Sequence, residues 1–544
     1  MMSSKFVNNR NKTALPFVFV WLLALLSPIY AFSQNVKQEW NHIEDPNLLM
    51  WSINSATVIL GVQGSDMFTY IPEHGNYGNN SYYIQKFSNN KLVWKVDVAL
   101  KSSDGQKIQF VNAVMIKGGI AVFGCLTNKK NKTSVFYQQF ISPQDGSLIG
   151  SLRELESFPY SKQYDNYSQI FNFAVSPDSS KVLITHFLNG EEKNEKFLRV
   201  AVKVYDISYK EIWETQFKIE NCIYFDKYED LKVDNKGNAF FIVGFSYHPN
   251  AKGEIYPSAK IFVVTAATKE ANEIKLPENQ APIHATFEFD LSNRLVLSGS
   301  CGEQLGSRKL FIARLDPEMK NVALKTEKKY DEKLMSEVNG QVNIALGRDA
   351  YPEHKICKLI PLPDKGFMVV SQMFSSENMT NVSHGSATTG GLFTDYFDVF
   401  ISRVDENLNF LWTKSVRMMY FRQAAPEWPY GSALPIVSSK YFYLYFKDNS
   451  DNLNIPLDKM YAKGTKINRA EEGGFYDLGK VKNNVEEVYI LDLKTGNILE
   501  RKVLDAYKTS KRMSFKNKSL FLSPTKVIML GSEKDTQVGV LEFE

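Results

Sequence analysis

Cysteine is scarce in this chain, and its few cysteines stand far apart. The 544 residues contain 4 cysteines, and no two of them have the C-x-x-C spacing that zinc sites and redox motifs use. A zinc site built from cysteines is therefore not expected. Two interpretations stay open for the four, namely disulfides, as an exported protein allows, or buried free thiols, which their places in apolar runs favour. The cysteines are Cys125, Cys222, Cys301 and Cys357.

The sequence also lacks the short motifs of several enzyme classes. It contains no G-x-S-x-G, no H-E-x-x-H and no phosphate-binding P-loop. Residues 448–452 carry oxygen ligands at alternate positions, as calcium loops do, but the Gly and Glu that such a loop needs further on are missing. We interpret that segment as a solvated loop tip, and we predict no catalytic residue, no metal and no cofactor.

Long apolar runs are absent after the N-terminus. There, three basic residues precede an apolar run at 14–26 that is too short to cross a bilayer, and Ala31, Phe32 and Ser33 offer a small-residue cleavage site. No cysteine follows that run, which argues against a lipid anchor. We therefore predict a signal peptide at residues 1–33 and export to the periplasm or the extracellular space, with no membrane insertion after its removal.

Excess charge is absent from the expected mature chain. The full chain has 64 basic and 60 acidic residues. Residues 1–33 hold 3 of the basic residues and none of the acidic ones, so the remainder has 61 basic against 60 acidic residues. A chain this close to neutral gives no reason to expect nucleic acid or an anionic membrane surface as a partner.

What the sequence does have is a repeated pattern of short apolar runs. In the clearest unit the runs lie at 355–362, 367–374, 399–404 and 410–416, separated by Asp, Asn, Pro and Gly. Runs rich in Val, Ile, Phe and Trp between such turn residues predict the four strands of a β-meander. Seven units of this kind, and an eighth with only three runs, fill the chain from residue 48 onward.

A spare apolar segment at 36–43 supplies the strand that the last unit lacks. Its Trp40 parallels Trp94 and Trp412, which stand in fourth strands elsewhere. Pairing of this segment with 538–543 would close a ring and leave no long sheet edge unpaired. We therefore predict an all-β fold, a single eight-bladed β-propeller with four-stranded antiparallel blades. Seven blades with a flanking hairpin is the alternative.

Two families of propeller repeat are similar to short segments of this chain. Residues 489–496, Tyr-Ile-Leu-Asp-Leu-Lys-Thr-Gly, and the Leu-Val-Trp-Lys at 92–95 resemble the repeat of pyrroloquinoline-quinone-type propellers. The Ser-Pro-Asp at 176–178, followed by Lys-Val-Leu-Ile at 181–184, is similar to the TolB or WD40-like repeat. The resemblance implies a propeller fold and export. It does not imply quinone binding, because the Thr-Gly of the repeat appears once and the chain has no vicinal cysteine pair.

Within the expected single domain at 34–544, length variation falls on one class of loop. Turns between the first and second runs, and between the third and fourth, are short in every unit. Long insertions between second and third runs lie at 64–81, 375–395 and 448–484. In a meander these insertions and the connections between units emerge at the same end of the strands, so one face of the disc would carry all of them. Loops this long in a compact domain usually serve function or lack fixed structure.

The expected loop-rich face is rich in aromatic residues. Exposed aromatics among polar neighbours suit contact with a protein, a peptide or a glycan, and the alternative for each is packing within its own loop. Histidines that precede a first strand would lie near the mouth of the central channel. The candidate binding residues are Trp428, Tyr430, Tyr396, Phe393, Tyr70, Tyr256, Phe475, Tyr476, His354 and His284.

Three functions fit these observations. The first is an exported, non-enzymatic propeller that binds a protein, peptide or glycan through its loop-rich face. The second is a propeller enzyme, either polysaccharide-active or a quinoprotein-like oxidoreductase, with its site at the channel mouth. The third is a surface scaffold without a dedicated ligand. Acidic and basic side chains that converge on the channel mouth would favour the enzyme, whereas a broad aromatic surface would favour the binding protein.

Overall fold

The described part of the chain is almost entirely β-strand. Among its residues, no helix is long and apolar enough to cross a membrane. The computed structural model describes residues 36–42, 58–74, 80–89, 91–117, 119–128, 130–159, 171–188, 197–220, 225–245, 259–276, 282–301, 309–330, 353–379, 383–384, 387–388, 391–418, 420–423, 433–456, 459, 467–468, 470–472, 484–505, 513–523, 525–532 and 536–543.

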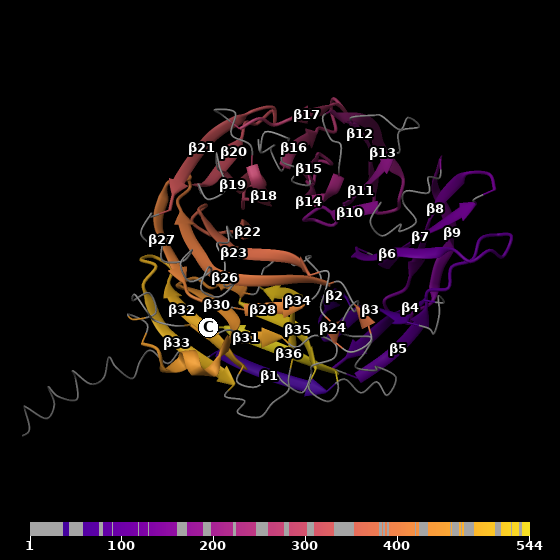
Figure 1. Ribbon diagram of the computed structural model, residues 1–544. Helices are drawn as coiled ribbons and strands as arrows, with labels where there is room; N and C mark the ends of the chain where they lie inside the picture. Colours follow the sequence, from indigo (N-terminus) through magenta and orange to yellow (C-terminus); the bar gives the residue numbers. More distant parts are fainter. Residues whose placement is uncertain are drawn as a thin grey trace, which may run out of the picture.

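Eight sheets follow one another along the chain and are arranged as the ring in Figure 1. In the first six blades, the first strand of each lies toward the centre of the ring. Blades 1 and 2 contain β2 (Val58–Gln63), β3 (Asp66–His74), β4 (Asn80–Ser88), β5 (Lys91–Asp97), β6 (Gln109–Ile116), β7 (Gly119–Asn128), β8 (Thr133–Ile141) and β9 (Leu148–Pro159). Blades 3 and 4 contain β10 (Phe171–Val175), β11 (Lys181–Leu188), β12 (Phe197–Asp206), β13 (Glu211–Glu220), β14 (Phe225–Val233), β15 (Ala239–Phe245), β16 (Ala259–Val264) and β17 (Ala271–Glu273).

The next three blades follow the same antiparallel order. Blade 5 contains β18 (Pro282–Phe289), β19 (Leu295–Cys301), β20 (Lys309–Leu315) and β21 (Val322–Lys329). Blade 6 contains β22 (Glu353–Pro361), β23 (Phe367–Met379), β26 (Gly391–Val404) and β27 (Phe410–Val416). Blade 7 contains β29 (Ala433–Val437), β30 (Tyr441–Asn449), β32 (Asn484–Asp492) and β33 (Ile498–Asp505).

The N-terminal strand closes the ring. Blade 8 contains β34 (Met513–Ser523), β35 (Lys526–Ser532) and β36 (Thr536–Phe543), and β1 (Val36–His42) pairs antiparallel with β36 as its fourth strand. In this pairing Trp40 stands opposite Gly539. The predicted eight-bladed propeller with strand exchange between its termini is confirmed, and the seven-bladed alternative is wrong.

Blade 1 differs from its predicted layout. The expected insertion at 64–81 is mostly sheet, because β3 occupies Asp66–His74 and pairs with both β2 and β4. Gly64 has a left-handed backbone (φ 62°), which lets the chain turn between the paired Gln63 and Asp66. The residues at both ends of β3 are polar, so the pattern of apolar runs did not predict this strand. The first strand of the blade is β2, and residues 48–57, where the first unit was expected to begin, lie outside the described residues.

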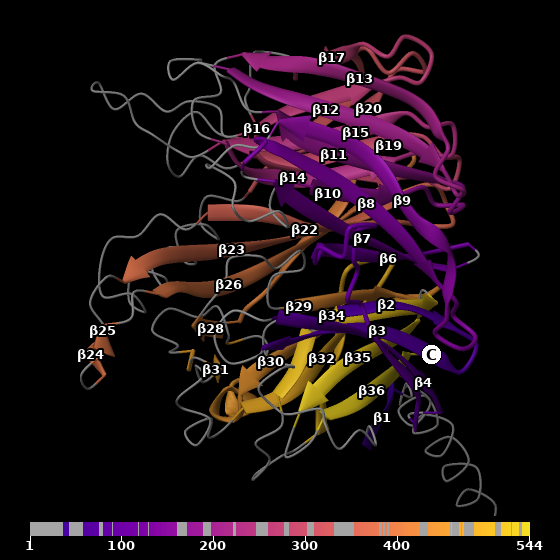
Figure 2. The ribbon, with the colours of Figure 1, turned by 90° about the vertical axis from the view of Figure 1, so that its right-hand side faces the viewer.

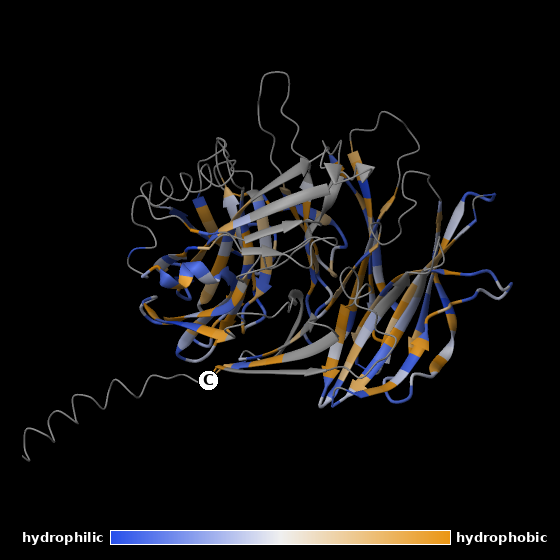
Figure 3. Cartoon of the chain, turned by 60° about the horizontal axis from the view of Figure 1, so that its bottom comes forward, coloured by the Kyte–Doolittle hydropathy of each residue, from blue (hydrophilic) through white to orange (hydrophobic). Residues whose placement is uncertain are grey.

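The hydrophobic cores lie between neighbouring blades. Successive side chains of a strand point to opposite faces of its sheet, so each inner sheet presents apolar residues to both neighbours. Leu183 and Val202 of blade 3 pack with Phe241 of blade 4, and Tyr443 of blade 7 packs with Leu541 of blade 8. Figure 3 shows hydrophobic and hydrophilic residues interspersed along the strands.

Aspartates organise the tight turns, which lie together on one side of the disc (Figure 2). The Oδ1 atom of Asp405 accepts hydrogen bonds from the backbone nitrogens of Asn407 (2.9 Å) and Asn409 (2.8 Å), and Leu408 between them has a left-handed φ of 63°. These aspartates therefore have a structural role in the turns. Carboxylates hold turns in a similar way at Asp206, Asp234, Asp290 and Asp316.

Tryptophans in the fourth strands of blades 1, 3 and 6 join each of these blades to the next. Each indole N–H donates to a backbone carbonyl in a tight turn of the following blade. Beside one of these turns the ring also covers a glycine, since a Cβ added to Gly496 would lie 2.6 Å from the Trp412 ring. The three bonds run from Trp94 to Gln144 (3.2 Å), from Trp213 to Gly237 (3.0 Å) and from Trp412 to Leu493 (3.2 Å).

Candidate binding face and its buried charge cluster

Blade 6 extends beyond the disc on the side opposite the tight turns. Its β23 and β26 stay paired past the body of the blade, with residues 375–379 opposite 391–395. Figure 2 shows these strands projecting from the disc, with the short pair β24 (Ser383–His384) and β25 (Ala387–Thr388) beyond their ends. The insertion predicted at 375–395 is therefore a continuation of the blade rather than a separate loop.

Two further strands widen this projecting part of the sheet. β27 covers β26 only from Val399 to Val404, and beyond it β28 (Tyr420–Gln423) pairs with β26 at Phe393 to Tyr396. β31 (Ala470–Glu472) then pairs with β28 in parallel. We call residues 375–379 and 391–395, together with β28 and β31, the blade 6 extension. Because β31 belongs to the insertion of blade 7, the extension joins two blades.

The insertion of blade 7 begins directly after β30 with a short 3-10 helix, η3 (Ser450–Asn454). Asn449 caps this helix by accepting a hydrogen bond from the Asp451 nitrogen (3.0 Å). The Asn452 side chain makes two reciprocal bonds to the backbone of Asn468, from Nδ2 to the carbonyl (2.7 Å) and from the Asn468 nitrogen to Oδ1 (2.8 Å). Asn468 stands two residues before β31, so η3 is tied to the segment that enters the extension.

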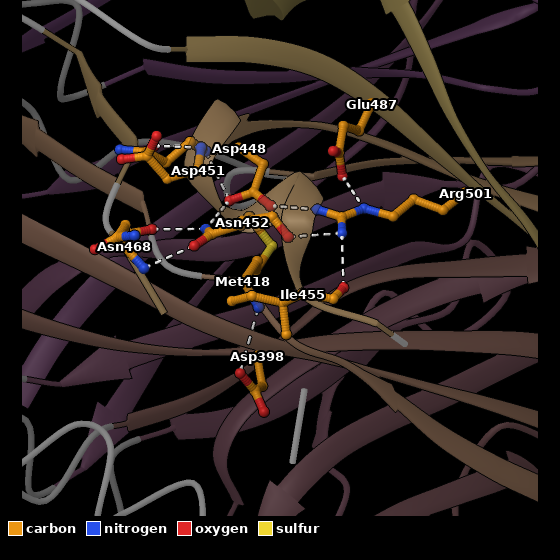
Figure 4. Close-up of polar contacts among 10 residues, drawn as sticks. Asp398, Met418, Asp448, Asp451, Asn452, Ile455, Asn468, Glu487 and Arg501 are labelled. Carbon is orange, nitrogen blue, oxygen red and sulfur yellow. Dashed lines mark hydrogen bonds and ion pairs between the residues drawn. The ribbon is translucent and has the colours of Figure 1, made fainter. Parts of the chain in front are cut away.

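A buried charge cluster fixes η3 to blade 7 (Figure 4). Arg501 of β33 donates from Nε to Glu487 Oε2 (3.0 Å) and from Nη2 to Asp448 Oδ2 (3.1 Å). Its Nη1 donates to the carbonyls of Asn452 (2.9 Å) and Ile455 (3.5 Å). Asn452 in turn donates to Asp448 Oδ1 (2.7 Å). One guanidinium therefore joins β30, β32 and η3, and we call Arg501, Asp448, Glu487 and Asn452 the charge cluster.

Burial sets the electrostatics of this cluster. The side chains of Asp448 and Glu487 are 1% and 0% exposed, and that of Arg501 is 9% exposed. Burial raises the pKa of Asp448 to about 6 against the hydrogen bonds and the Arg501 charge that lower it. Burial and the Asp448 charge raise the pKa of Glu487 to about 7. Burial would lower the pKa of Arg501, but the Glu487 hydrogen bond and nearby charges raise it.

A second buried ion pair lies close by in blade 6. Arg417 Nε is 3.9 Å from Asp398 Oδ2, and both side chains are buried. The backbone nitrogen of Met418 donates to Asp398 Oδ1 (3.4 Å). Tyr489 lies near both the charge cluster and this ion pair. Burial raises its pKa, and the negative charges of Glu487, Asp448 and Asp398 raise it further. Charged groups therefore occupy the interface of blades 6 and 7 beneath the extension.

Sequence reasoning missed this cluster. Residues 448–452 are not a solvated loop tip, because Asp448 and Asn452 are fully buried. The available signal was the presence of charged residues in three successive strands of one unit, Asp448 in β30, Glu487 in β32 and Arg501 in β33. In the part of the chain that the structure describes, no group of three or more His, Cys, Asp or Glu residues could hold a metal ion.

Three of the predicted binding residues belong to the core instead. Tyr70 packs on Phe110 (ring centroids 5.4 Å apart), and burial raises its pKa to about 12. His354 lies 4.9 Å from the Tyr330 ring and is buried between blades 5 and 6. Tyr396 is 7% exposed, in the core around blade 6. Their apolar surroundings explain this, since an aromatic at a strand end gains more from a neighbouring blade than from water.

The remaining predicted residues lie on the extension side or outside the described residues. His284 begins the regular pairing of β18 and is half-buried, with its ring 6.0 Å from that of Phe374. Phe393 is part of β26, opposite Gln423 of β28, and so belongs to the extension. Trp428, Tyr430, Tyr256, Phe475 and Tyr476 lie outside the described residues.

One more buried titratable group lies between blades 2 and 3. His186 of β11 is fully buried, and burial, followed by the charge of Lys203, lowers its pKa to about 4. Its Nε2 atom is 3.6 Å from Glu156 Oε1, which also pairs with Lys203 (3.3 Å). The imidazole packs against Phe158 and Phe171. This histidine is therefore a neutral part of the core.

Comparison with known proteins gives structural likenesses only. No family model matches the chain, and no curated protein sequence matches it. Among solved structures, the WD40 domain of SCAP from fission yeast is 9% identical, with 93% of this chain and 98% of that chain covered and a TM-score of 0.38. A europium-containing methanol dehydrogenase is 10% identical, with 90% and 92% covered and a TM-score of 0.39.

A third likeness is to prolyl oligopeptidase B from Galerina marginata, which is 10% identical, with 96% of this chain and 58% of that chain covered and a TM-score of 0.34. These structures include both a WD40 domain and enzymes. The assignment as a propeller rests on the pairing of the strands in this chain, which agrees with the WD40-like and quinoprotein-like repeats found in its sequence.

Proposed function

We propose that this protein is an exported, non-enzymatic recognition protein that holds a protein, peptide or glycan on the face that bears the blade 6 extension. Export rests on the predicted signal peptide. A closed ring presents a projecting sheet with little loss of conformational entropy on binding, because its eight blades already fix the ends of every strand.

The observation that carries this proposal is how the extension is built. Strands from different blades form one sheet, and a buried guanidinium with two carboxylates fixes the base of that sheet. Burying charge is costly unless each charge is paired and hydrogen-bonded. A loop that only connects two strands does not need a buried ion cluster to hold it. The presence of this cluster therefore supports an ordered surface that contacts a ligand.

The paired polar side chains on the first strands of blades 4 and 5 favour binding at the face over catalysis at this part of the ring axis. Asp230 Oδ2 accepts from Thr286 Oγ1 (2.7 Å) and from the Phe287 nitrogen (2.8 Å), and Lys232 Nζ pairs with Glu288 Oε2 (3.0 Å). These contacts run between the first strands of blades 4 and 5. They join the two blades to each other, which gives both acidic groups a structural role.

The test is a variant in which Asn-Gly replaces residues 375–395. Phe374 and Tyr396 are paired in the native sheet, so a two-residue turn closes the shortened hairpin. The intact protein and the variant are compared on a glycan array and on a printed peptide library, and thermal unfolding checks the fold. We expect ligands of the intact protein to bind the variant at least tenfold more weakly.

A matched control makes the same edit on the opposite face. Asn-Gly replaces residues 316–321, whose flanking Leu315 and Val322 are also paired. This variant should keep every ligand. A 375–395 variant that folds and binds all ligands as well as the intact protein would overturn the proposal, as would hydrolysis or oxidation of an arrayed compound by the intact protein.

A further inference from the structure

The charge cluster has one cation for two anions. Arg501 is the shared partner of Asp448 and Glu487, and all three side chains are removed from water. If both carboxylates were ionised, one negative charge would remain uncompensated in a medium of low dielectric constant. A proton held by the pair removes that charge and still leaves an ionised carboxylate for the guanidinium.

The same cluster connects blade 7 with the extension. Arg501 donates to the carbonyls of Asn452 and Ile455, and Asn452 bonds to both Asp448 and Asn468. From Asn468 the chain enters β31, which pairs with β28 of the extension. Any change in the charge of the carboxylate pair therefore acts on the anchor of η3 and, through Asn468, on β31.

We propose that proton binding by Asp448 and Glu487 controls how tightly η3 and β31 are held against blade 7, so that the face carrying the extension is ordered in mildly acidic solution and loosened above neutral pH. The consequence for a ligand rests on the proposed function. The effect on the protein itself does not, because the anchor exists without a ligand.

Among the ion pairs of the described residues, Arg501 is the cation that Asp448 and Glu487 share. From β33 the carboxylate pair meets Arg501, from η3 the Asn452 side chain, and from the end of β30 the Asn449 nitrogen. From β32 it meets Tyr489, whose pKa is raised and which stays neutral. From blade 6, Asp398 adds negative charge and is paired with Arg417.

The residues next to the pair in β30 and β32 do not change the net charge around it. Lys447 and Glu486 are buried and stand opposite each other in the pairing of β30 and β32. Successive side chains of a strand point to opposite faces, so both point away from the face that holds Asp448 and Glu487.

The direction of the pH effect follows from these surroundings. In water the two carboxyl groups would have ordinary pKa values near 4, whereas in the cluster the pKa is raised to about 6 for Asp448 and about 7 for Glu487. The anchored state therefore binds more protons than a state in which η3 has separated and the carboxylates are hydrated. Anchoring is complete below the ordinary values and weakens as pH rises through about 6 to 7.

Hydrogen exchange of the ligand-free, full-length mature protein tests the inference. Exchange in peptides covering 449–456 and 467–472 is measured by mass spectrometry at pH 5.5 and pH 8, with labelling times scaled for the intrinsic pH dependence of exchange. We expect protection to fall on going to pH 8, by up to about tenfold per pH unit where one proton is released. In the Glu487→Gln variant, the neutral side chain should keep protection nearly constant across this range.

The control is Glu288→Gln, which neutralises a partly exposed ion pair with Lys232 on the inner strands and should behave as wild type in both peptides. Equal protection of the wild type at both pH values would overturn the inference, as would an unchanged pH response in Glu487→Gln. If that variant fails to fold, Asp448→Asn serves the same purpose. Because no ligand is present, a negative result here leaves the proposed function to be judged by the array experiment.

Discussion

At the scale of single residues, substitution is most restricted at the positions where one blade packs against the next. Gly496 has a left-handed backbone (φ 71°) and lies under the Trp412 ring, whose indole N–H bonds to the carbonyl of Leu493. Gly64 has a similar φ of 62° but no atom within 4 Å of an added Cβ. Substitutions at these two glycines therefore distinguish the cost of backbone strain from the cost of disturbed packing between blades.

We predict that Gly496→Ala destabilises the protein more than Gly64→Ala does. Both variants force alanine into a left-handed conformation, which costs about 1 kcal/mol, but only Gly496→Ala also pushes a methyl group into the Trp412 ring, for roughly 1–3 kcal/mol more. Unfolding in urea, followed by fluorescence, measures the difference. Equal loss of stability in the two variants would show that the indole adapts to the methyl group.

A second prediction concerns the charge cluster. Arg501→Met keeps the volume of the side chain but leaves Asp448 and Glu487 buried without their cation, which should cost roughly 3–5 kcal/mol at pH 8. The loss should shrink at pH 5, because protonation removes the charge of both carboxyl groups, whose pKa values are raised. Lys320→Met, which breaks an exposed pair with Glu318, should change stability by less than about 1 kcal/mol. A defect in Arg501→Met that is independent of pH would contradict this account.

At the scale of elements, closure depends on a single short strand. β1 covers the edge of β36 through seven paired positions, from Val36 opposite Phe543 to His42 opposite Gln537. Without it, blade 8 keeps three strands and presents an unpaired edge, which invites pairing with other chains.

We predict that removal of residues 34–43 from the mature chain lowers the midpoint of thermal unfolding and causes concentration-dependent association. Removal of residues 1–33 alone should do neither. Differential scanning calorimetry and size-exclusion chromatography with light scattering measure the two effects. A truncated protein that stays monomeric and unfolds at the same temperature would mean that β1 contributes little to closure.

The elements also show what the sequence could reveal. Apolar runs bounded by turn residues predicted the blades, and Trp40 indicated the closing strand, because both signals come from local packing. The extension was not predicted, since its strands are polar and their pairing is set by contacts between distant segments such as Tyr420 and Ala470. The charge cluster depends on the same long-range pairing. Which aromatic residues are buried could not be predicted either, as Tyr70 and His354 show, because burial depends on how closely neighbouring blades approach.

At the scale of the whole molecule, the question is whether the ring unfolds as one unit. Cys125, Cys301 and Cys357 lie in blades 2, 5 and 6 as thiols rather than disulfides, as one of the two sequence interpretations held. Burial raises the pKa of both Cys125 and Cys357 to about 12, which keeps these thiols protonated and unreactive in the folded state. Each cysteine therefore reports on the opening of its own blade.

We predict that the three thiols become reactive together. Blades that share cores with both neighbours and are closed by β1 lose packing on two sides when any one of them opens, so local opening of a single blade is costly. Pulsed alkylation across a urea gradient, followed by peptide mass spectrometry, gives the midpoint for each cysteine, and Cys222→Ser removes the remaining cysteine. The midpoints should coincide in the closed ring and separate when residues 34–43 are removed. Separate midpoints in the intact chain would show instead that the blades unfold independently.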